Sequence, residues 1–287
     1  MTRTIAICLV LSGCVADGGD PTDIESKLGH HGPVKLENPN THLQPGDDGD
    51  GSGSDVQMPS SVPSDPIDFQ ADNVFTLDSG TTNYVVVPSG YDPSHQTPEK
   101  LLVWLHGCGG YASGDIYKLA PELQGKGQDW IAIAVGGREG GCWDPDSDMD
   151  KVSAALDDIK SHFNIQPNAV VLGGYSSGGD LGYRMIFDHT KLFAGLIAEN
   201  TSPFRDTGAT QAQSLAAASW KINILHLAHL QDQTYPIAGV RAETDAVKNA
   251  GFPLTRIERD GAHYDDNTDS DFETYLLPAM DAGWLAP

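Results

Sequence analysis

The feature that most constrains the fold is a regular alternation of short apolar runs with helical patterns, which begins near residue 71. Each run has the length of a β-strand and is apolar throughout, so both faces of such a strand would be buried. Strands of this kind, separated by helices, predict a mostly parallel sheet with helices on both faces, which is an α/β architecture. The runs are Leu101–Leu105, Trp130–Val135, Ala169–Leu172, Leu192–Ala198, Ile222–Leu227 and Leu254–Ile257.

A β-hairpin is predicted ahead of these runs. Its strands are Val74–Leu77 and Tyr84–Val87, and Asp78-Ser79-Gly80 supplies turn residues between them. The sequence contains no internal repeat and no sign of a second domain, so we expect a single α/β domain over residues 71–287. The predicted helices are Asp148–Phe163, Gly179–Asp188, Gln211–Ser219, Ile237–Ala250 and Asp271–Ala282.

The first 14 residues predict a targeting signal. Arg3 gives a short positive region, and Ile5–Leu11 is an apolar run too short to cross a bilayer. The segment Leu11–Cys14 resembles a bacterial lipobox, which implies that Cys14 is lipidated and becomes the first mature residue. We therefore expect a lipoprotein of the cell envelope, periplasmic or at the cell surface, that contacts a membrane only through this anchor. An ordinary cleaved signal of a secreted protein and a buried N-terminal strand are the alternatives.

Residues 15–70 are predicted to be an acidic linker. They hold eleven acidic residues against two lysines, with Gly, Pro and Ser between them and no apolar periodicity. Such a segment buries too little apolar surface to offset the entropy of ordering it. The acidic run Asp47–Gly53 suggests a calcium loop, but the twelfth position counted from Asp48 is Pro59 rather than Glu, so the EF-hand pattern fails. The formal net charge of -23 also argues against a nucleic-acid partner.

The strongest chemical signal is the segment Gly174–Gly178, which reads Gly-Tyr-Ser-Ser-Gly and follows a predicted strand. A serine on a sharp strand-to-helix turn needs small neighbours, because larger side chains would clash with the strand and the helix. The helix N-terminus behind Ser176 favours developing negative charge. The pattern is typical of a nucleophile elbow, and a Gly/Ser-rich loop is the alternative.

A nucleophilic serine needs a base and an acid. Proteins with this elbow place the acid and then the histidine after the serine, and His263 is the only histidine after Asp232. Asp232 lies shortly after the Ile222–Leu227 run, at the edge of the sheet where Ser176 is expected, and it would orient the imidazole and stabilise its charged form. Glu199 and Asp206 are the alternative acids.

An anion site is predicted after the Leu101–Leu105 run, where His106–Gly110 reads His-Gly-Cys-Gly-Gly. The amide of Cys108 or Gly109, together with that of Ser177, would form an oxyanion hole. No CxxC or HxxxH spacing occurs, so we expect no metal site, a structural role for His106 and no cofactor.

Two cysteines are left once the predicted signal is removed and Cys14 is lipidated. They are Cys108 and Cys142. In a compartment that permits disulfides they could be bonded, which the chain-entropy model values at about 3–4 kcal/mol, or they could be two free thiols.

Together these motifs resemble the α/β-hydrolase fold over about residues 74–285. His106–Gly110, with Gly140–Trp143 and Gly174–Gly179, looks like the secreted polyhydroxybutyrate depolymerase and feruloyl esterase group. The resemblance implies a Cys108–Cys142 disulfide that braces the oxyanion loop against the loop carrying Trp143. The acid loop departs from it: the group often has His-Gly-x-x-Asp, and this chain has Ala228–Asp232, which reads Ala-His-Leu-Gln-Asp.

The function that follows is an extracytoplasmic serine esterase with Ser176, His263 and Asp232 as its triad. The resemblance implies feruloyl or acetyl esters of plant polysaccharide, or a polyester, as substrate, which could be polymeric. Trp143 and Tyr175 would line the acyl pocket, or else serve in packing. The alternatives are a serine peptidase or thioesterase of the same fold, and a non-catalytic lipoprotein that binds a polymer. We expect a monomer.

Overall fold

The structure, a computed structural model, describes residues 74–88, 91, 98–125, 130–189, 192–205, 211–218, 221–265 and 271–281. The predicted signal with Cys14, the predicted linker 15–70 and Asp206 lie outside the described residues, so the expectations about them remain predictions. Within the described ranges, no helix combines the length and the apolar character that a membrane crossing requires.

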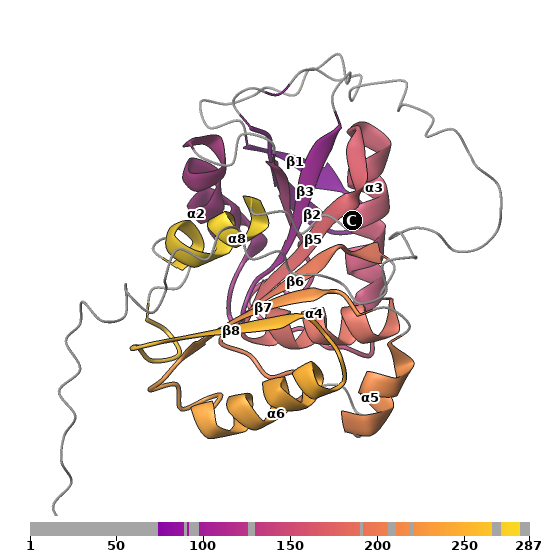
Figure 1. Ribbon diagram of the computed structural model, residues 1–287. Coiled ribbons are helices and arrows are strands. Elements are labelled where there is room, and N and C mark those ends of the chain that lie inside the picture. The colour runs from indigo at the N-terminus through magenta and orange to yellow at the C-terminus, as the bar shows by residue number, and fades with distance from the viewer. Residues whose placement is uncertain are drawn as a thin grey trace, which may run out of the picture. The chain divides into compact units, whose positions relative to one another are not determined.

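The described residues form one sheet of eight strands. The strands are β1 (Val74–Asp78), β2 (Thr82–Val86), β3 (Glu99–Leu105), β4 (Trp130–Ala134), β5 (Ile165–Tyr175), β6 (Gly195–Glu199), β7 (Asn223–His229) and β8 (Leu254–Arg259). Their order across the sheet is β1-β2-β4-β3-β5-β6-β7-β8. The succession from β5 to β8 can be followed in Figure 1. β1 pairs antiparallel with β2, and β2 antiparallel with β4, whereas β4 through β8 are parallel. The predicted mostly parallel sheet is confirmed.

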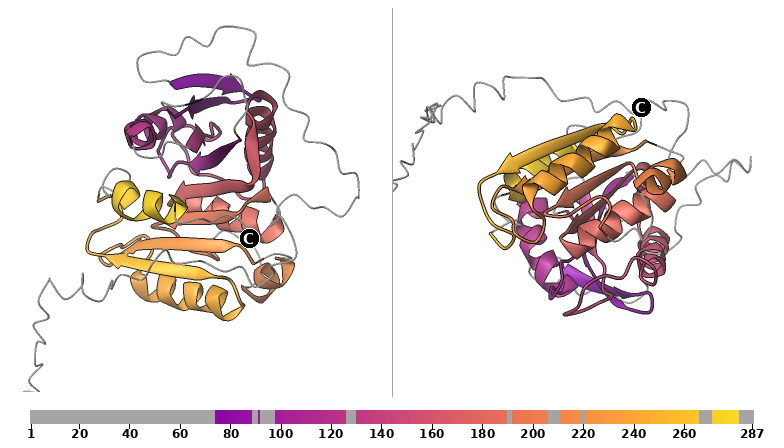
Figure 2. Two further views of the ribbon diagram at one scale, coloured as in Figure 1. Left: turned by 45° about the horizontal axis from the view of Figure 1, so that its top comes forward. Right: turned by 90° about the horizontal axis from the view of Figure 1, so that it is seen from below.

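Helices cover both faces of this sheet (Figures 1 and 2). Side chains of β3 alternate between the two layers, because successive residues of a strand point to opposite faces. Leu101 and Leu105 pack in the layer of α3 (Met149–His162) and α4 (Ser177–Asp188). Leu102 and Trp104 pack in the layer of α2 (Ala112–Gly125) and α8 (Leu277–Asp281). Further helices are α5 (Gln211–Ala217) and α6 (Ile237–Asn249), and a π-helical turn at Phe272–Leu276 precedes α8.

The sequence analysis missed the helix α2 and placed several strand boundaries a few residues away from their observed positions, with the largest difference at the start of β5. The buried residues Ile116, Leu119 and Leu123 of α2 recur at helical spacing, but Pro121 lies inside the helix and obscures the pattern. β5 begins at Ile165 rather than at Ala169, because its first residues pair with β3 before a shift in register.

The topology determines where a site forms. β3 has β4 on one side and β5 on the other, so the connections that follow β3 and β5 leave in opposite directions and open a crevice at the carboxyl edge of the sheet. The loops after β7 and β8 end at the same edge, because these strands run parallel to β5. The predicted oxyanion loop, the turn with Ser176 and the loops with Asp232 and His263 therefore meet at this edge.

Candidate active site

Ser176 lies on the turn between β5 and α4 and has an unusual backbone conformation, with φ 52° and ψ −121°. Few residues other than glycine adopt a positive φ. The turn is held by the Ser176 amide, which donates to the carbonyl oxygen of Glu199 at 2.9 Å. A Cβ on Gly174 would lie 2.5 Å from the backbone of Gly178, and a Cβ on Gly178 would overlap the carbonyl oxygen of Leu105. Glycine at both positions lets the strand and the helix approach closely enough to form the turn.

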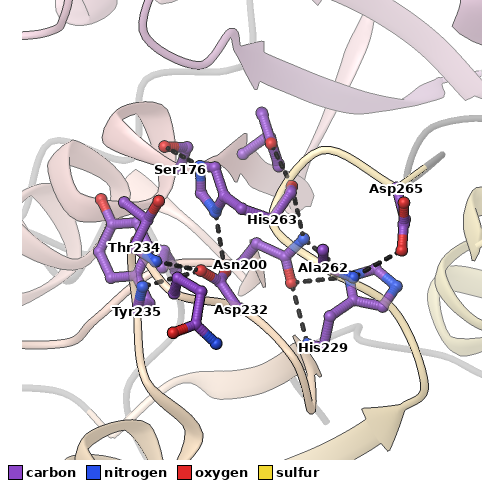
Figure 3. A network of polar contacts seen from close by, with 12 residues as sticks. Ser176, Asn200, His229, Asp232, Thr234, Tyr235, Ala262, His263 and Asp265 are labelled. Atoms are coloured by element: carbon purple, nitrogen blue, oxygen red, sulfur yellow. Dashed lines mark hydrogen bonds and ion pairs between the residues drawn. The ribbon is translucent and has the colours of Figure 1, made fainter.

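The structure brings Ser176, His263 and Asp232 together (Figure 3). His263 Nε2 lies 3.1 Å from Ser176 Oγ, and His263 Nδ1 lies 2.8 Å from Asp232 Oδ2. All three residues are buried. The second oxygen of Asp232 accepts the backbone amides of Thr234 at 2.7 Å and Tyr235 at 2.8 Å. This arrangement can move a proton from the hydroxyl to the imidazole and stabilise the charged imidazole against the carboxylate.

His263 is held by contacts that the sequence did not reveal. Its carbonyl oxygen accepts the Tyr175 hydroxyl at 2.5 Å and the Asn200 side-chain amide at 3.2 Å. The ring of Tyr175 also stacks on the imidazole, with 5.3 Å between centroids. Tyr175, predicted to line the acyl pocket or to serve in packing, therefore packs against His263.

A second buried polar cluster begins at Asn200, which contacts both His263 and His229 (Figure 3). Asn200 Oδ1 lies 2.9 Å from His229 Nδ1 and accepts the His229 backbone amide at 3.1 Å. His229 Nε2 lies 3.3 Å from a carboxylate oxygen of Asp271, which also pairs with Arg259. Burial lowers the pKa of His229, with the charge of Arg259 acting in the same direction. The cluster fixes Asn200, and through it the backbone of His263.

The predicted oxyanion loop, His106–Gly110, is joined to the loop that carries Trp143 by one disulfide and two backbone hydrogen bonds. Cys108 and Cys142 form a disulfide across 34 residues. The Gly109 amide donates to the carbonyl oxygen of Gly141 at 3.1 Å, and the Gly140 amide donates to that of Gly110 at 2.9 Å. The Gly109 amide is therefore already engaged with a backbone acceptor, which favours Cys108 of the two predicted oxyanion donors. The partner amide, from Ser177, is in the first turn of α4, where backbone amides face the helix end.

A cavity of about 330 Å³ lies beside Ser177. Trp143 is part of its wall, and the Trp143 Nε1 donates to the carbonyl oxygen of His106 at 2.8 Å. The predicted pocket residue Trp143 is thus both packed and in contact with the cavity. Further wall residues are Cys108, Ser177, Asp180, Arg205 and Tyr235.

Two further residues singled out in the sequence, Glu199 and His106, lie outside the contacts between Ser176, His263 and Asp232. The side chain of Glu199 is buried on β6. His106 places its Nδ1 2.7 Å from the carbonyl oxygen of Gly107 and packs its ring 4.9 Å from that of Trp143. Among the residues that the structure describes, no group of His, Cys, Asp or Glu side chains is arranged to hold a metal ion.

Comparison with known proteins identifies the fold. No protein-family model matches the sequence, and a search of curated proteins finds no match. Among solved structures, esterase PE8 matches with a TM-score of 0.56 and 16% identity, over 68% of this chain and 97% of its own. A ferulic acid esterase matches with a TM-score of 0.57 and 15% identity, over 73% of this chain and 98% of its own. An S-formylglutathione hydrolase of Staphylococcus aureus matches with a TM-score of 0.57 and 14% identity, over 75% of this chain and 96% of its own. The domain has the α/β-hydrolase fold, as predicted.

Proposed function

We propose that this chain is a serine hydrolase that cleaves carboxylic esters. The observation that carries the proposal is the continuous line of contacts from Ser176 Oγ through His263 to Asp232, on a strand-to-helix turn in an α/β-hydrolase fold. The esterase names of several structural neighbours support the same chemistry.

In the proposed reaction, Ser176 Oγ attacks the ester carbonyl carbon while His263 Nε2 takes the hydroxyl proton. The carbonyl oxygen becomes an oxyanion that accepts the amides of Cys108 and Ser177. The tetrahedral intermediate expels the alcohol, which leaves with the proton from His263, and an acyl-enzyme remains. Water then attacks the acyl carbon, giving its proton to His263, and the acid departs as Ser176 regains its hydrogen. Asp232 holds the imidazole in the required tautomer throughout.

We further propose that the substrates are feruloyl or acetyl esters of plant polysaccharide, or a polyhydroxyalkanoate-type polyester. The cavity beside Ser177, with Trp143 in its wall, offers room for an acyl group, and one structural neighbour is a ferulic acid esterase. A location outside the cytoplasm, with an anchor at Cys14, is proposed from the sequence. The Cys108–Cys142 disulfide is consistent with it, because such bonds persist in oxidising compartments.

The test is hydrolysis of p-nitrophenyl acetate and butyrate by the full chain and by Ser176→Ala. We expect the substitution to lower kcat by about 10⁴-fold or more, because removing a triad nucleophile eliminates the acyl-enzyme route. Ser153→Ala serves as the matched control, because it makes the same substitution at a serine of α3 that is not part of the proposed site, and it should leave the rate unchanged. Equal rates for the wild type and Ser176→Ala would refute the proposal.

Two further measurements separate it from its alternatives. Stoichiometric labelling of Ser176 by a fluorophosphonate is expected, because labelling requires an activated serine. A binding protein without catalytic activity would remain unlabelled. A panel of feruloyl, peptide and thioester substrates then assigns the acyl class, and a preference for peptides or thioesters would overturn the ester assignment while keeping the nucleophile.

A further inference from the structure

A buried carboxylate lies on the helix that carries the nucleophile, outside the three residues that perform the proposed chemistry. Asp180 is in the first turn of α4, four residues after Ser176, and is only 2% exposed. Its Oδ1 accepts the Thr201 hydroxyl at 2.5 Å and the Ser202 backbone amide at 3.1 Å. Its Oδ2 accepts the Tyr235 hydroxyl at 2.5 Å. Donors on both oxygens are what a buried charge requires.

Tyr235 belongs to the loop that carries the catalytic acid. Its backbone amide donates to Asp232 Oδ1 at 2.8 Å, and its ring lies 5.5 Å from the ring of His263 (Figure 3). The guanidinium carbon of Arg205 lies 4.5 Å from the centroid of the Tyr235 ring. Burial and the neighbouring charge of Asp180 raise the pKa of Tyr235, so its hydroxyl keeps its proton and remains a donor. Tyr235 therefore contacts the acid, the base and the nucleophile's helix at once.

We propose that Asp180 and Tyr235 form a positioning pair, which ties the acid loop to the nucleophile helix and so sets the alignment of His263 with Ser176. This inference rests on the proposed serine hydrolase function.

The connection matters because the triad is assembled from three separate segments. Ser176 follows β5, Asp232 follows β7 and His263 follows β8, so their relative position depends on contacts between the segments. Asp180 moves with Ser176 because both lie at the start of α4, and Tyr235 moves with Asp232 because both belong to one tight turn. A displacement of about 1 Å in reacting groups can cost about 100-fold in rate. The hydroxyl–carboxylate bond resists that displacement directly.

Packing alone does not account for the pair. A buried charge costs free energy when it leaves water, and buried ionic groups can often be replaced by apolar side chains without loss of stability. An apolar pair would fill the same space between α4 and the acid loop. It would lack a directional bond, which defines both a distance and an orientation. The observed pair supplies one, within the wall of the cavity beside Ser177.

The experiment compares two substitutions in the full chain that each remove one hydroxyl donor from Asp180. Tyr235→Phe breaks the link to the acid loop, whereas Thr201→Val removes a donor from the other oxygen and leaves the link in place. Both should lower the melting temperature. Only Tyr235→Phe should lower kcat for an aryl ester, by about tenfold, with KM changed less than twofold. The rate of fluorophosphonate labelling should fall in parallel, because it reports on Ser176 and His263 without deacylation.

A double-mutant comparison gives a second readout. Tyr235→Phe introduced into Asp180→Asn should reduce kcat less than it does in the wild type, because the anchor of the hydroxyl has already been weakened. Unchanged kcat and labelling in Tyr235→Phe would overturn the positioning pair and leave the proposed function standing. Equal losses of kcat in Tyr235→Phe and Thr201→Val would also overturn it, since both would then act through stability. Absence of Ser176-dependent labelling in the wild type would overturn the proposed function, and the pair with it.

Discussion

At the scale of single residues, the site depends on positions where even a methyl group does not fit. A Cβ on Gly178 would overlap the carbonyl oxygens of Leu105 and His106, at the end of β3. A Cβ on Gly107 would lie 2.5 Å from the ring of Tyr175, which packs against His263. Interiors are packed too densely to absorb such overlaps without moving a main chain. The turn that presents Ser176 therefore packs directly against the oxyanion loop, and glycine at positions 107 and 178 permits this close approach.

Gly178→Ala should accordingly damage both stability and activity. The new methyl group must push the start of α4 away from β3, which moves Ser176 and the Ser177 amide together. We expect a loss of about 1–3 kcal/mol of unfolding free energy, the usual range for overpacking, and labelling by fluorophosphonate slowed at least tenfold. Gly114→Ala on α2 is the control, since a Cβ there meets nothing within 4 Å and alanine favours helix. Similar behaviour of the two variants would contradict the packing explanation.

A buried histidine away from Ser176 makes stability depend on pH. His226 on β7 places its Nδ1 2.8 Å from the hydroxyl of Tyr183. Burial, followed by the nearby charge of Arg256, lowers the pKa of His226 from 6.5 to about 3. Between these two values the unfolded chain binds a proton that the folded chain does not, so this contribution to stability falls as the pH drops from 6.5 toward 3. The slope from one such group is about 1.4 kcal/mol per pH unit.

His226→Gln should remove that slope. The variant is expected to be less stable than the wild type at pH 7, because it loses a packed ring, yet to lose less of its remaining stability on acidification. Urea unfolding at pH 7, 6 and 5 measures the free energy of unfolding directly. A variant whose stability declines as steeply as that of the wild type would show that His226 does not carry this dependence.

At the scale of elements, the sequence predicted the strands and the triad better than it predicted what supports them. Ser176, Asp232 and His263 could be found because each follows an apolar strand, and parallel strands end at one edge. The roles of Asp180 and Asn200 could not be found, because their partners are distant in sequence: 55 residues separate Asp180 from Tyr235. Chain order alone does not reveal which polar side chains meet across such a distance.

The oxyanion loop is the element whose geometry depends most on a covalent link. Cys108→Ala/Cys142→Ala should lower the free energy of unfolding by about 3–4 kcal/mol, because a closed loop of 34 residues restricts the unfolded chain. The backbone bonds of Gly109 and Gly140 remain and should keep the loop partly in place. We expect kcat to fall by a larger factor than KM changes, since the Cys108 amide is proposed to bind the oxyanion.

Thermal unfolding and aryl-ester kinetics, with and without a thiol reductant, measure both effects. The reductant should destabilise the wild type and leave the double variant unchanged, which controls for other effects of the reagent. A variant as stable as the wild type would mean that the two loops hold together without the disulfide.

At the scale of the whole molecule, the chain divides its acidic charge between two parts with different expected roles. Residues 15–70 contain eleven of the 40 acidic residues, in a composition that predicts no packed core. The remaining acids belong mostly to the domain with the α/β-hydrolase fold, whose residues from Val74 onward include buried and paired carboxylates such as Asp148 and Asp180. The low apolar fraction of the chain, 39%, therefore averages over a folded α/β domain and a segment predicted to act as a linker.

The last prediction concerns the start of the chain, where the sequence places two cysteines with different expected fates. If Cys14 carries the lipid, each acyl methylene buried in a bilayer contributes about 0.8 kcal/mol, and the full chain expressed in a bacterium should sediment with the membrane fraction. Cys14→Ser should release it into the soluble extracytoplasmic fraction with its aryl-esterase activity intact. Cys8→Ser, within the predicted apolar stretch of the signal, should remain with the membrane. Mass spectrometry of the mature N-terminus identifies the modification, and identical fractionation of Cys14→Ser and the wild type would show that Cys14 is not the anchor.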